Sequence, residues 1–297
     1  MKVMRLITRA DLDGLTSAVL IREMEKIDSI ELIHPQDITD KKFIVRSGDI
    51  LANVPYHPDC GLWFDHHLLT DSNEKPPANF KGMYRTAPSA ARVILEYYNS
   101  PKLKRFERLV AETDRMDSAD LTVEDVLSPS GYILLGYTID PRSGLGEFEN
   151  YFLSLVDALR NQSIEQILEM PEVKNRIERM KSKWEDFKAL TLKHSRMEKN
   201  VVVTDFRNID PPPVGNRFLV YTLFPEANVS VRIHWGPKKQ HVAVIVGHVI
   251  FNRTCKVNVG ELMSQHGGGG HIGAGSAIVW EESAEEAIQE ILRNLQA

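Results

Sequence analysis

Two aspartates near the start of the chain follow a predicted strand, at the end of a sheet where cations commonly bind. Asp11 and Asp13 follow an apolar run at 3–7 that has the length and composition of a strand. Open α/β sheets place their ligands at the carboxyl ends of strands, so two carboxylates here predict a metal site. The alternative is an ordinary turn, because Asp-x-Asp-Gly is also a common turn sequence.

A second group of potential metal ligands ends another predicted strand, at 61–64. Asp65, His66 and His67 are adjacent there, and carboxylates with imidazoles suit Mn²⁺ or Mg²⁺ better than thiolate-loving metals. A histidine pair also occurs in cores and on surfaces, which is the competing interpretation. The position at a strand end favours a metal site.

Single carboxylates stand before and after this triplet. Asp49 lies in the segment SGDILANVP, and Asp114 lies on a predicted helix at 102–117. Asp117 shares a helix face with Asp114 because the two are three residues apart. Each carboxylate alone is typical of a solvated side chain or a helix cap, and the sequence leaves open whether Asp114 or Asp117 would reach a metal.

Four consecutive glycines at 267–270, followed by His271, form a candidate phosphate-binding loop. Glycine lets the backbone approach a phosphate closely, and successive N–H groups in such a loop form a nest for anions. A flexible linker is the alternative. His266 on one side and the Gly-Ala-Gly sequence at 273–275 on the other favour a shaped loop.

The elements that must position these residues alternate between strand and helix in the first half of the chain. This order predicts an α/β fold with a parallel sheet. In the second half, apolar runs predict a smaller mixed sheet. The predicted strands are 3–7, 30–33, 61–64, 201–204, 218–224, 229–235 and 241–246, and the predicted helices are 14–26, 89–98, 102–117 and 284–294.

A helical stripe at 172–197 suggests where the chain divides. Its apolar positions recur at steps of three and four, and the Pro-Pro-Pro sequence at 211–213 follows soon after. We interpret 172–199 as a connector between domains at 1–171 and 200–297. A core helix of the first domain is the alternative.

Length and composition agree with a two-domain protein. The 297 residues are 42% hydrophobic and 26% charged, and a domain averages ~150 residues. The sequence contains neither an apolar run near ~18 residues nor a signal-peptide pattern, so we expect a cytoplasmic protein without a membrane partner. Its two cysteines, Cys60 and Cys255, do not form a disulfide framework.

The net charge of −5 conceals an acidic first segment. Residues 1–171 hold 27 acidic and 19 basic side chains, a net charge of −8. This balance argues against a polybasic nucleic-acid surface. If the segment handles an anionic substrate, it needs cations, and divalent metals on clustered carboxylates would supply them.

The order of these motifs resembles the DHH phosphoesterase superfamily with its DHH-associated C-terminal domain. The resemblance spans most of the chain, and VIFNRTCKVNVGELMSQHGGGGHIGAG is similar to the C-terminal signature of the exopolyphosphatase-like or nanoRNase-like branch. It implies a parallel-sheet DHH domain at 1–171 and a smaller substrate-binding domain at 200–297. It also implies an active-site cleft between the two domains.

The resemblance implies roles for individual residues. One or two Mn²⁺ or Mg²⁺ ions would be held by Asp11, Asp13, Asp49, His66 and Asp114. The substrate would be gripped from the second domain by Arg253, Gly268, Gly269, Gly270 and His271. The catalytic set would contain His67, which faces the substrate phosphate in such families, and Asp65, which orients or lies beside the site. Arg9 is added to this set for its own chemistry and not from the resemblance.

Arg9 departs from the pattern of this family. Members often carry a His or Asp ligand two residues before the first aspartate of the loop, whereas a guanidinium stays cationic and cannot bind a metal. Arg9 would either clamp a phosphate oxygen or replace part of the charge of one ion. In the second case we expect one metal site to be weak or empty.

We therefore expect a metal-dependent phosphoesterase that cleaves a terminal linkage of a small, phosphate-rich substrate. Candidate substrates are a short single-stranded oligonucleotide, 3′-phosphoadenosine 5′-phosphate or a dinucleotide. Two alternatives remain: an exopolyphosphatase, and a non-hydrolytic nucleotide or polyphosphate sensor with a degraded metal site. The sequence leaves the oligomeric state open, a homodimer included.

Overall fold

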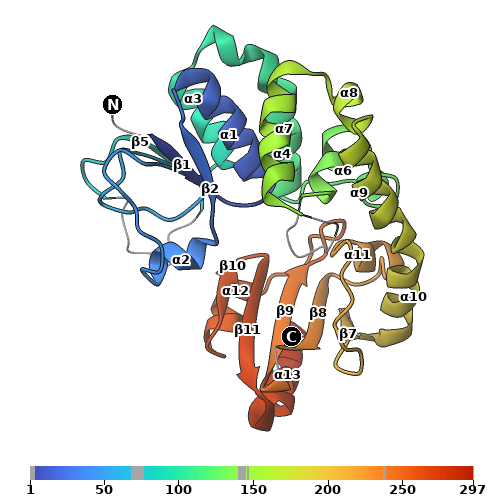
Figure 1. Cartoon of the computed structure of the whole chain (residues 1–297). Helices are drawn as coiled ribbons and strands as arrows, with labels where there is room; N and C mark the ends of the chain where they lie inside the picture. The colour runs from blue at the N-terminus through green and yellow to red at the C-terminus, as the bar shows by residue number, and fades with distance from the viewer. Residues whose placement is uncertain (1–3, 68–76, 140–144, 146, 237–238, 297) are drawn as a thin grey trace. The chain divides into compact units, whose positions relative to one another are not determined.

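A computed structural model of the protein describes residues 4–67, 77–139, 145, 147–236 and 239–296. The chain divides into two compact units. Unit 1 contains residues 1–121 and 129–179, and unit 2 contains residues 122–128 and 180–297. In Figure 1, unit 1 accounts for nearly all of the blue and green ribbon and unit 2 for the orange and red ribbon.

Unit 1 is built on a five-stranded sheet in which every pair of neighbours is parallel. The strand order is β2-β1-β3-β4-β5. The sheet therefore confirms the α/β, parallel-sheet prediction. All the strands end at the same edge, which brings the residues that follow them together. The strands are β1 (Arg5–Thr8), β2 (Ser29–Leu32), β3 (Ile50–Ala52), β4 (Leu62–Asp65) and β5 (Gly82–Tyr84).

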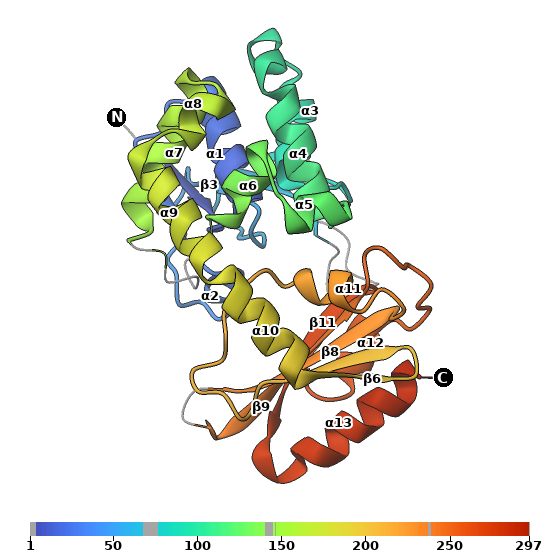
Figure 2. The ribbon, with the colours of Figure 1, turned by 90° about the vertical axis from the view of Figure 1, so that its right-hand side faces the viewer.

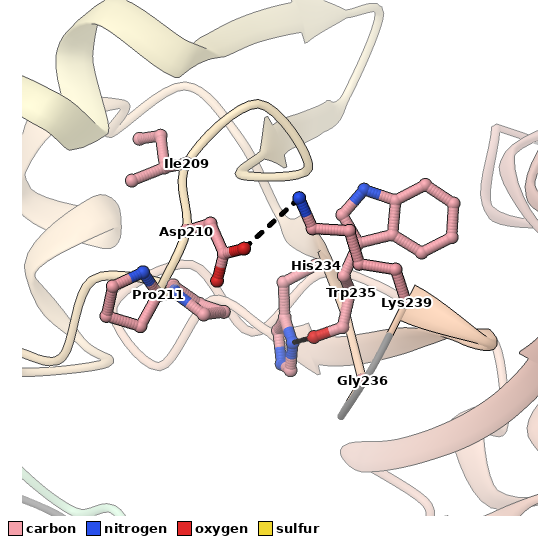
Figure 3. A pocket seen from close by; sticks show the side chains of 8 residues that line it. Ile209, Asp210, Pro211, His234, Trp235, Gly236 and Lys239 are labelled. Atoms are coloured by element: carbon pink, nitrogen blue, oxygen red, sulfur yellow. Dashed lines mark hydrogen bonds and ion pairs between the residues drawn. The ribbon is translucent and has the colours of Figure 1, made fainter.

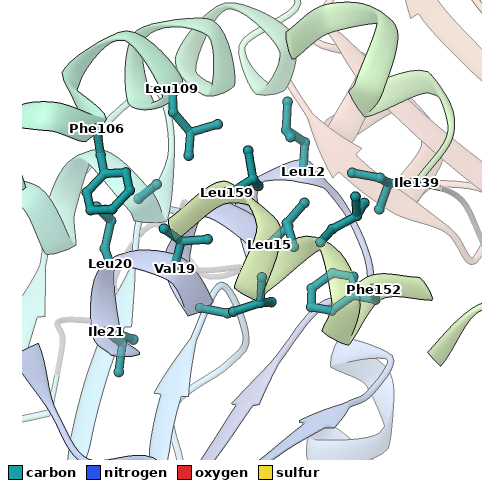
Figure 4. Packing of buried hydrophobic residues seen from close by; sticks show 14 of the residues in the cluster. Leu12, Leu15, Val19, Leu20, Ile21, Phe106, Leu109, Ile139, Phe152 and Leu159 are labelled. Atoms are coloured by element: carbon teal, nitrogen blue, oxygen red, sulfur yellow. The ribbon is translucent and has the colours of Figure 1, made fainter. Parts of the chain in front are cut away.

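Helix α1 (Leu12–Met24) lies at the centre of unit 1. Its residues from Leu12 to Ile21 are all buried, as expected of a helix with other elements on every side. Figure 4 shows Leu15 and Val19 of α1 among side chains from the surrounding helices, such as Leu109 and Phe152. This packing fixes the start of α1, where the two aspartates of the first motif stand.

The other helices of unit 1 surround α1 or connect the strands. Helices α3, α4 and α7 all contact α1. The helices are α2 (Pro35–Thr39), α3 (Ala90–Tyr98), the 3-10 helix η1 (Pro101–Phe106), α4 (Glu107–Asp117), α6 (Gly131–Tyr137), α7 (Glu149–Asn161), α8 (Ile164–Leu168) and α9 (Pro171–Ser182).

The segment at 172–199 consists of two helices and a strand. Val173 and Ile177 of α9 belong to the core of unit 1. Phe187 of α10 (Trp184–His194) packs instead with Phe206 and Leu219 of unit 2. The division between the two cores therefore falls near the end of α9.

Unit 2 is built on a six-stranded mixed sheet with the order β10-β11-β9-β8-β7-β6. Only β7 and β8 are parallel. The long helix α13 packs against β9 and β11 (Figure 2). The strands are β6 (Ser195–Glu198), β7 (Val201–Asp205), β8 (Val229–Trp235), β9 (His241–His248), β10 (Gly269–His271) and β11 (Ala274–Trp280). The remaining helices are α5 (Val123–Leu127), α11 (Leu219–Leu223), α12 (Val259–Ser264) and α13 (Glu281–Leu295).

One predicted strand is wrong. Residues 218–224 were expected to form a strand, but Leu219–Leu223 form the helix α11. Leu219 and Tyr221 are both buried, and a short apolar run of this kind has no periodicity that separates a strand from a buried helix.

None of the helices that the structure describes has both the length and the apolar composition of a membrane-spanning segment.

Candidate functional site

The first motif folds as the start of α1, at the carboxyl end of β1. Asp11 is the N-cap of α1, and its Oδ1 accepts a hydrogen bond of 2.8 Å from the backbone N–H of Gly14. Asp13 is 1% exposed, and its two oxygens accept 2.8 Å hydrogen bonds from the backbone N–H groups of Ala90 and Ala91. A helix start at the sheet edge thus holds two carboxylates that the sequence placed two residues apart.

His66 presents an unpaired nitrogen to two of the carboxylates. Its Nδ1 lies 2.9 Å from the carbonyl oxygen of Ala87, which only accepts, so Nδ1 carries a proton. In the neutral ring, Nε2 is then a bare lone pair. Nε2 is buried, lies 3.6 Å from Oδ2 of Asp13 and 3.3 Å from Oδ2 of Asp117, and has no hydrogen-bond partner among the described residues.

A lone pair that faces two carboxylates is unfavourable until a proton or a metal cation lies between them. Among the described residues, Asp13, His66 and Asp117 form one of two groups whose potential ligand atoms all lie within 4.8 Å of one another. Hard carboxylate oxygens with one imidazole match the ligand preference of Mn²⁺ or Mg²⁺. The residues present therefore fit a divalent cation.

The pKa values of the two carboxyl groups agree with this arrangement. Burial, together with the charges of Asp117 and Asp11, raises the pKa of Asp13 well above its usual range. Burial and the charge of Asp11 also raise the pKa of Asp117, a shift that positive charge on His66, His67 or Arg9 would oppose. Both carboxylates are therefore costly as anions without a partner, and a bound cation would relieve that cost.

The other group of potential ligands is the triplet itself. Oδ1 of Asp65 accepts a 2.7 Å hydrogen bond from Nδ1 of His67 and a 2.8 Å bond from the backbone N–H of His66. Burial alone would lower the pKa of His67, but the bond to Asp65 and its charge raise it. Asp65 thus fixes the orientation of the His67 ring and favours its protonated form.

Arg9 and Asn53 both contact Asp11. Nε of Arg9 lies 3.0 Å from Oδ2 of Asp11, and Nδ2 of Asn53 donates a 3.0 Å hydrogen bond to Oδ1. Asn53 directly follows β3, and its own Oδ1 is buried without a hydrogen-bond partner in the described part of the chain. Asn53 is a residue that the sequence analysis missed, and its position after a strand was the available signal.

The structure does not bring Asp49 to this group. Asp49 precedes β3, so it lies at the amino edge of the parallel sheet. Its carboxylate accepts hydrogen bonds from Nε and a terminal nitrogen of Arg5, at 3.1 and 2.6 Å, and from the backbone N–H of Arg46 at 2.7 Å. We therefore leave Asp49 out of the ligand set and assign it to the Arg5 ion pair.

Asp114 also has other partners. Its Oδ1 accepts a 2.6 Å hydrogen bond from Oγ of Ser89, and its Oδ2 lies 2.5 Å from a terminal nitrogen of Arg92. Asp117, one helical turn further along α4, is the residue that faces His66. Of the two carboxylates that the sequence left open, the geometry favours Asp117 as the ligand.

The expected substrate-binding residues are all in unit 2. Arg253 is exposed, and its Nε donates to the carbonyl oxygen of Ile250 at 3.2 Å. His271 is exposed and ends β10, the edge strand that pairs with β11. Their expected role in gripping a phosphate stays a prediction.

The glycine run leads into this edge strand, and its last two residues, Gly269 and Gly270, belong to β10. A Cβ on Gly268 would lie 2.0 Å from the carbonyl oxygen of Ser276, and Gly270 has a φ of +157°. Gly269 has open space around it. Gly267 has a φ of +74°, so three of the four glycines are required by the local fold, whatever they bind.

A cavity of about 610 Å³ lies elsewhere in unit 2, and Figure 3 shows its lining. Trp235, Pro211 and His234 contribute to its walls, and Nζ of Lys239 pairs with Oδ2 of Asp210 at 3.1 Å. None of the residues that line it belongs to either group of potential metal ligands. The cavity therefore shares no residue with the group around His66.

Neither a family model nor a curated protein matches this chain, but solved structures do. The pGpG-specific phosphodiesterase PggH from Vibrio cholerae is 35% identical, with a TM-score of 0.82, over 99% of this chain and 100% of that chain. A DHH-domain protein described as a member of the S1p family of ribosomal proteins is 14% identical, with a TM-score of 0.67, over 99% and 87% of the two chains.

RecJ from Thermus thermophilus, solved in complex with Mn²⁺, is also similar. It is 13% identical, with a TM-score of 0.57, and the comparison covers 98% of this chain and 51% of that chain. At this identity the likeness shows a shared fold. The match to PggH, by contrast, extends over both chains at an identity that shows common family.

Proposed function

This chain belongs to the DHH phosphoesterase superfamily and is a phosphoester hydrolase, and from that premise we propose that it hydrolyses a linear dinucleotide such as pGpG with the help of a divalent cation. The observation that carries the cation is the bare Nε2 of His66, which faces Asp13 and Asp117. These three residues would hold Mn²⁺ or Mg²⁺, with Asp11 and the amide oxygen of Asn53 as candidates for further ligands. A cation bound there would lower the pKa of a coordinated water and offset the charge that develops on the phosphoryl oxygens.

His67 is suited to protonate the leaving oxygen. Its Nδ1 is held by Asp65 at 2.7 Å, so Nε2 is the nitrogen that would act on the substrate. The hydrogen bond and charge of Asp65 raise the pKa of His67 above its usual value, which favours the protonated ring that a general acid requires. We assign His67 as the general acid and Asp65 as the residue that orients it.

Arg9 is suited to bind a phosphate oxygen. Its Nε lies 3.0 Å from Oδ2 of Asp11, and its side chain is 44% exposed. The planar guanidinium presents its terminal nitrogens as a fork that matches two phosphate oxygens. Unit 2 would contribute Arg253, His271 and the glycine run to the same substrate.

The dinucleotide is the preferred substrate because PggH is similar to this chain from end to end. A relative with 35% identity over 100% of its length shares both units, including the unit that would recognise the substrate. The test is a panel of phosphate esters incubated with the full chain and Mn²⁺. The panel contains pGpG, pApA, a guanine pentanucleotide, 3′-phosphoadenosine 5′-phosphate and inorganic polyphosphate.

We expect pGpG to be converted into two molecules of GMP faster than any other member is consumed. The His66→Ala variant should abolish this turnover. Release of phosphate from polyphosphate as the main activity would replace the dinucleotide with the exopolyphosphatase alternative. Binding of the panel without turnover of any member would instead identify a sensor.

A further inference from the structure

We propose that Asp114 is a positioning residue for the cation site: it fixes Ser89 at the start of α3, and α3 in turn holds Asp13. This inference rests on the proposed function, because it concerns the affinity of the same site. Asp114 belongs to neither group of potential ligands among the described residues. Its effect on a cation would therefore pass through other residues.

The first link joins Asp114 to the cap of α3. Oγ of Ser89 donates a 2.6 Å hydrogen bond to Oδ1 of Asp114, since an ionised carboxylate only accepts. The same oxygen accepts a 3.0 Å hydrogen bond from the backbone N–H of Arg92. The hydroxyl of Ser89 therefore donates its proton to Asp114, and its oxygen remains free to accept the capping hydrogen bond of α3. Ser89 is fully buried, so no water competes for either bond.

The second link joins the start of α3 to Asp13. Ala90 and Ala91 directly follow Ser89, and their backbone N–H groups each donate a 2.8 Å hydrogen bond to one oxygen of Asp13. These bonds favour the ionised carboxylate, which is the form that a cation requires. Ala90 and Ala91 are the first two residues after the N-cap, so the position of Ser89 sets the direction in which their N–H groups point.

A third contact joins helix α3 to helix α4. Nε of Arg92 on α3 lies 2.9 Å from Oδ2 of Asp114 on α4. Helix α4 also carries Asp117, the proposed ligand one turn later. One helix therefore presents a ligand directly and, through Asp114 and Ser89, sets the position of another.

A purely structural role for Asp114 makes a different prediction. An ion pair that only joined α3 to α4 would change the stability of the fold and leave the affinity of the folded protein for a cation unaltered. The affinity for Mn²⁺ therefore separates the two roles. It can be measured by isothermal titration on the full chain, with thermal unfolding recorded for every variant.

We expect Asp114→Ala and Ser89→Ala each to weaken Mn²⁺ binding by about tenfold, which is the usual effect of removing a group that orients a ligand. The double variant should bind no more weakly than either single variant, because both act through one chain of contacts. Asp114→Asn keeps a carbonyl oxygen for Ser89 and should retain most of the affinity, with a loss of ~threefold or less.

The matched control is Thr113→Val. Thr113 lies on α4 beside Asp114, and its hydroxyl forms a buried 2.7 Å hydrogen bond with Thr16 of α1. The variant breaks that bond and changes no atom that contacts Ser89 or Asp13. It should lower the stability without weakening Mn²⁺ binding. Unchanged affinity in Asp114→Ala, or independent losses that multiply in the double variant, would overturn the proposal.

Two further outcomes have defined meanings. If Asp114→Ala does not fold, Asp114→Leu replaces it in the double-variant comparison with Ser89→Ala, because leucine fills a similar volume and accepts no hydrogen bond. Losses that multiply overturn the proposal in the same way. If the wild-type chain binds no Mn²⁺, the proposed function fails, and this inference fails with it. A wild-type chain that binds Mn²⁺ while Asp114→Ala binds it equally well leaves the proposed function intact.

Discussion

Oδ2 of Asp13 lies 3.6 Å from Nε2 of His66, although the two residues follow different strands of the sheet in unit 1. Their approach depends on parallel strands, whose carboxyl ends share an edge. Nδ1 of His66 is occupied by the carbonyl oxygen of Ala87, so the ring can turn only its other nitrogen toward the carboxylate. The pair is therefore an acceptor facing an anion, which a divalent cation completes.

Replacement of this histidine tests the cation site directly. His66→Ala removes the only neutral ligand of the group, and we expect Mn²⁺ affinity to fall by at least ~100-fold, with turnover lost in parallel. His57→Ala is the control, because His57 lies in the loop before β4, at the amino edge of the sheet. Isothermal titration with Mn²⁺ measures both variants, and equal affinities would exclude His66 as a ligand.

Asp117 should lower the stability of the metal-free protein while it contributes to the binding of Mn²⁺. Burial and the nearby charge of Asp11 raise its pKa, so its carboxylate is costly in the metal-free protein. We expect Asp117→Asn to raise the unfolding free energy without metal only slightly, by ~0.5 kcal/mol or less, because the side chain is 30% exposed and solvent screens the charge. The stabilisation that Mn²⁺ gives to the wild type should disappear. Thermal unfolding with EDTA and with Mn²⁺ checks both parts, and a variant that Mn²⁺ still stabilises would count against Asp117 as a ligand.

The sequence predicted the parallel sheet of unit 1, because several of its strands are clear apolar runs. Asp49 and Asn53 show what it could not predict. They flank β3, a three-residue strand that is absent from the predicted strands, so neither residue could be assigned to an edge of the sheet. Asp49 was named and Asn53 was missed, although Asn53 is the residue at the carboxyl edge.

The choice between Asp114 and Asp117 depended on a neighbouring helix. Both stand on one face of α4, so helical spacing alone cannot separate them. The contacts of Asp114 with Ser89 and Arg92 decide it, and both partners lie on a segment more than twenty residues away in the chain. Tertiary contacts of this kind leave no periodic signal in the sequence.

Glu23 should make the stability of unit 1 depend on acid pH. Its oxygens lie 2.7 Å from Nε of Arg160 and 2.9 Å from a terminal nitrogen of Arg105. Burial alone would raise the pKa of Glu23, but the two arginines lower it below the ordinary value of 4.5. Its contribution is therefore present above pH 4.5 and is lost as the pH falls through the lower, folded pKa.

We expect Glu23→Gln to be less stable than the wild type near pH 6, by up to ~1 kcal/mol because the pair is partly solvated. The difference should shrink as the pH falls through the lowered pKa of Glu23, because the wild-type carboxyl is then protonated as well. Urea unfolding at several pH values measures it. The same change made in the Arg105→Gln, Arg160→Gln background, which lacks both partners, should show a much weaker trend. A constant difference across this range would mean that the charge of Glu23 is unimportant.

The glycine run allows its structural and substrate-binding roles to be separated. A Cβ on Gly268 would lie 2.0 Å from a backbone oxygen, whereas nothing lies within 4 Å of a Cβ on Gly269. We expect Gly268→Ala to destabilise unit 2 by ~1–3 kcal/mol, as overpacking does, and Gly269→Ala to leave it nearly unchanged. Tryptophan fluorescence follows this unfolding, since three of the four tryptophans, Trp184, Trp235 and Trp280, are in unit 2.

Binding of GMP, the product expected from pGpG, then tests the second role. If the backbone of this strand contacts a phosphate, a methyl group on Gly269 would obstruct it, and Gly269→Ala should weaken GMP binding by about tenfold while the fold stays intact. Isothermal titration in the presence of Mn²⁺ measures the affinity. Normal GMP binding by Gly269→Ala, beside a destabilised Gly268→Ala, would show that the run is required for the edge strand and not for the ligand.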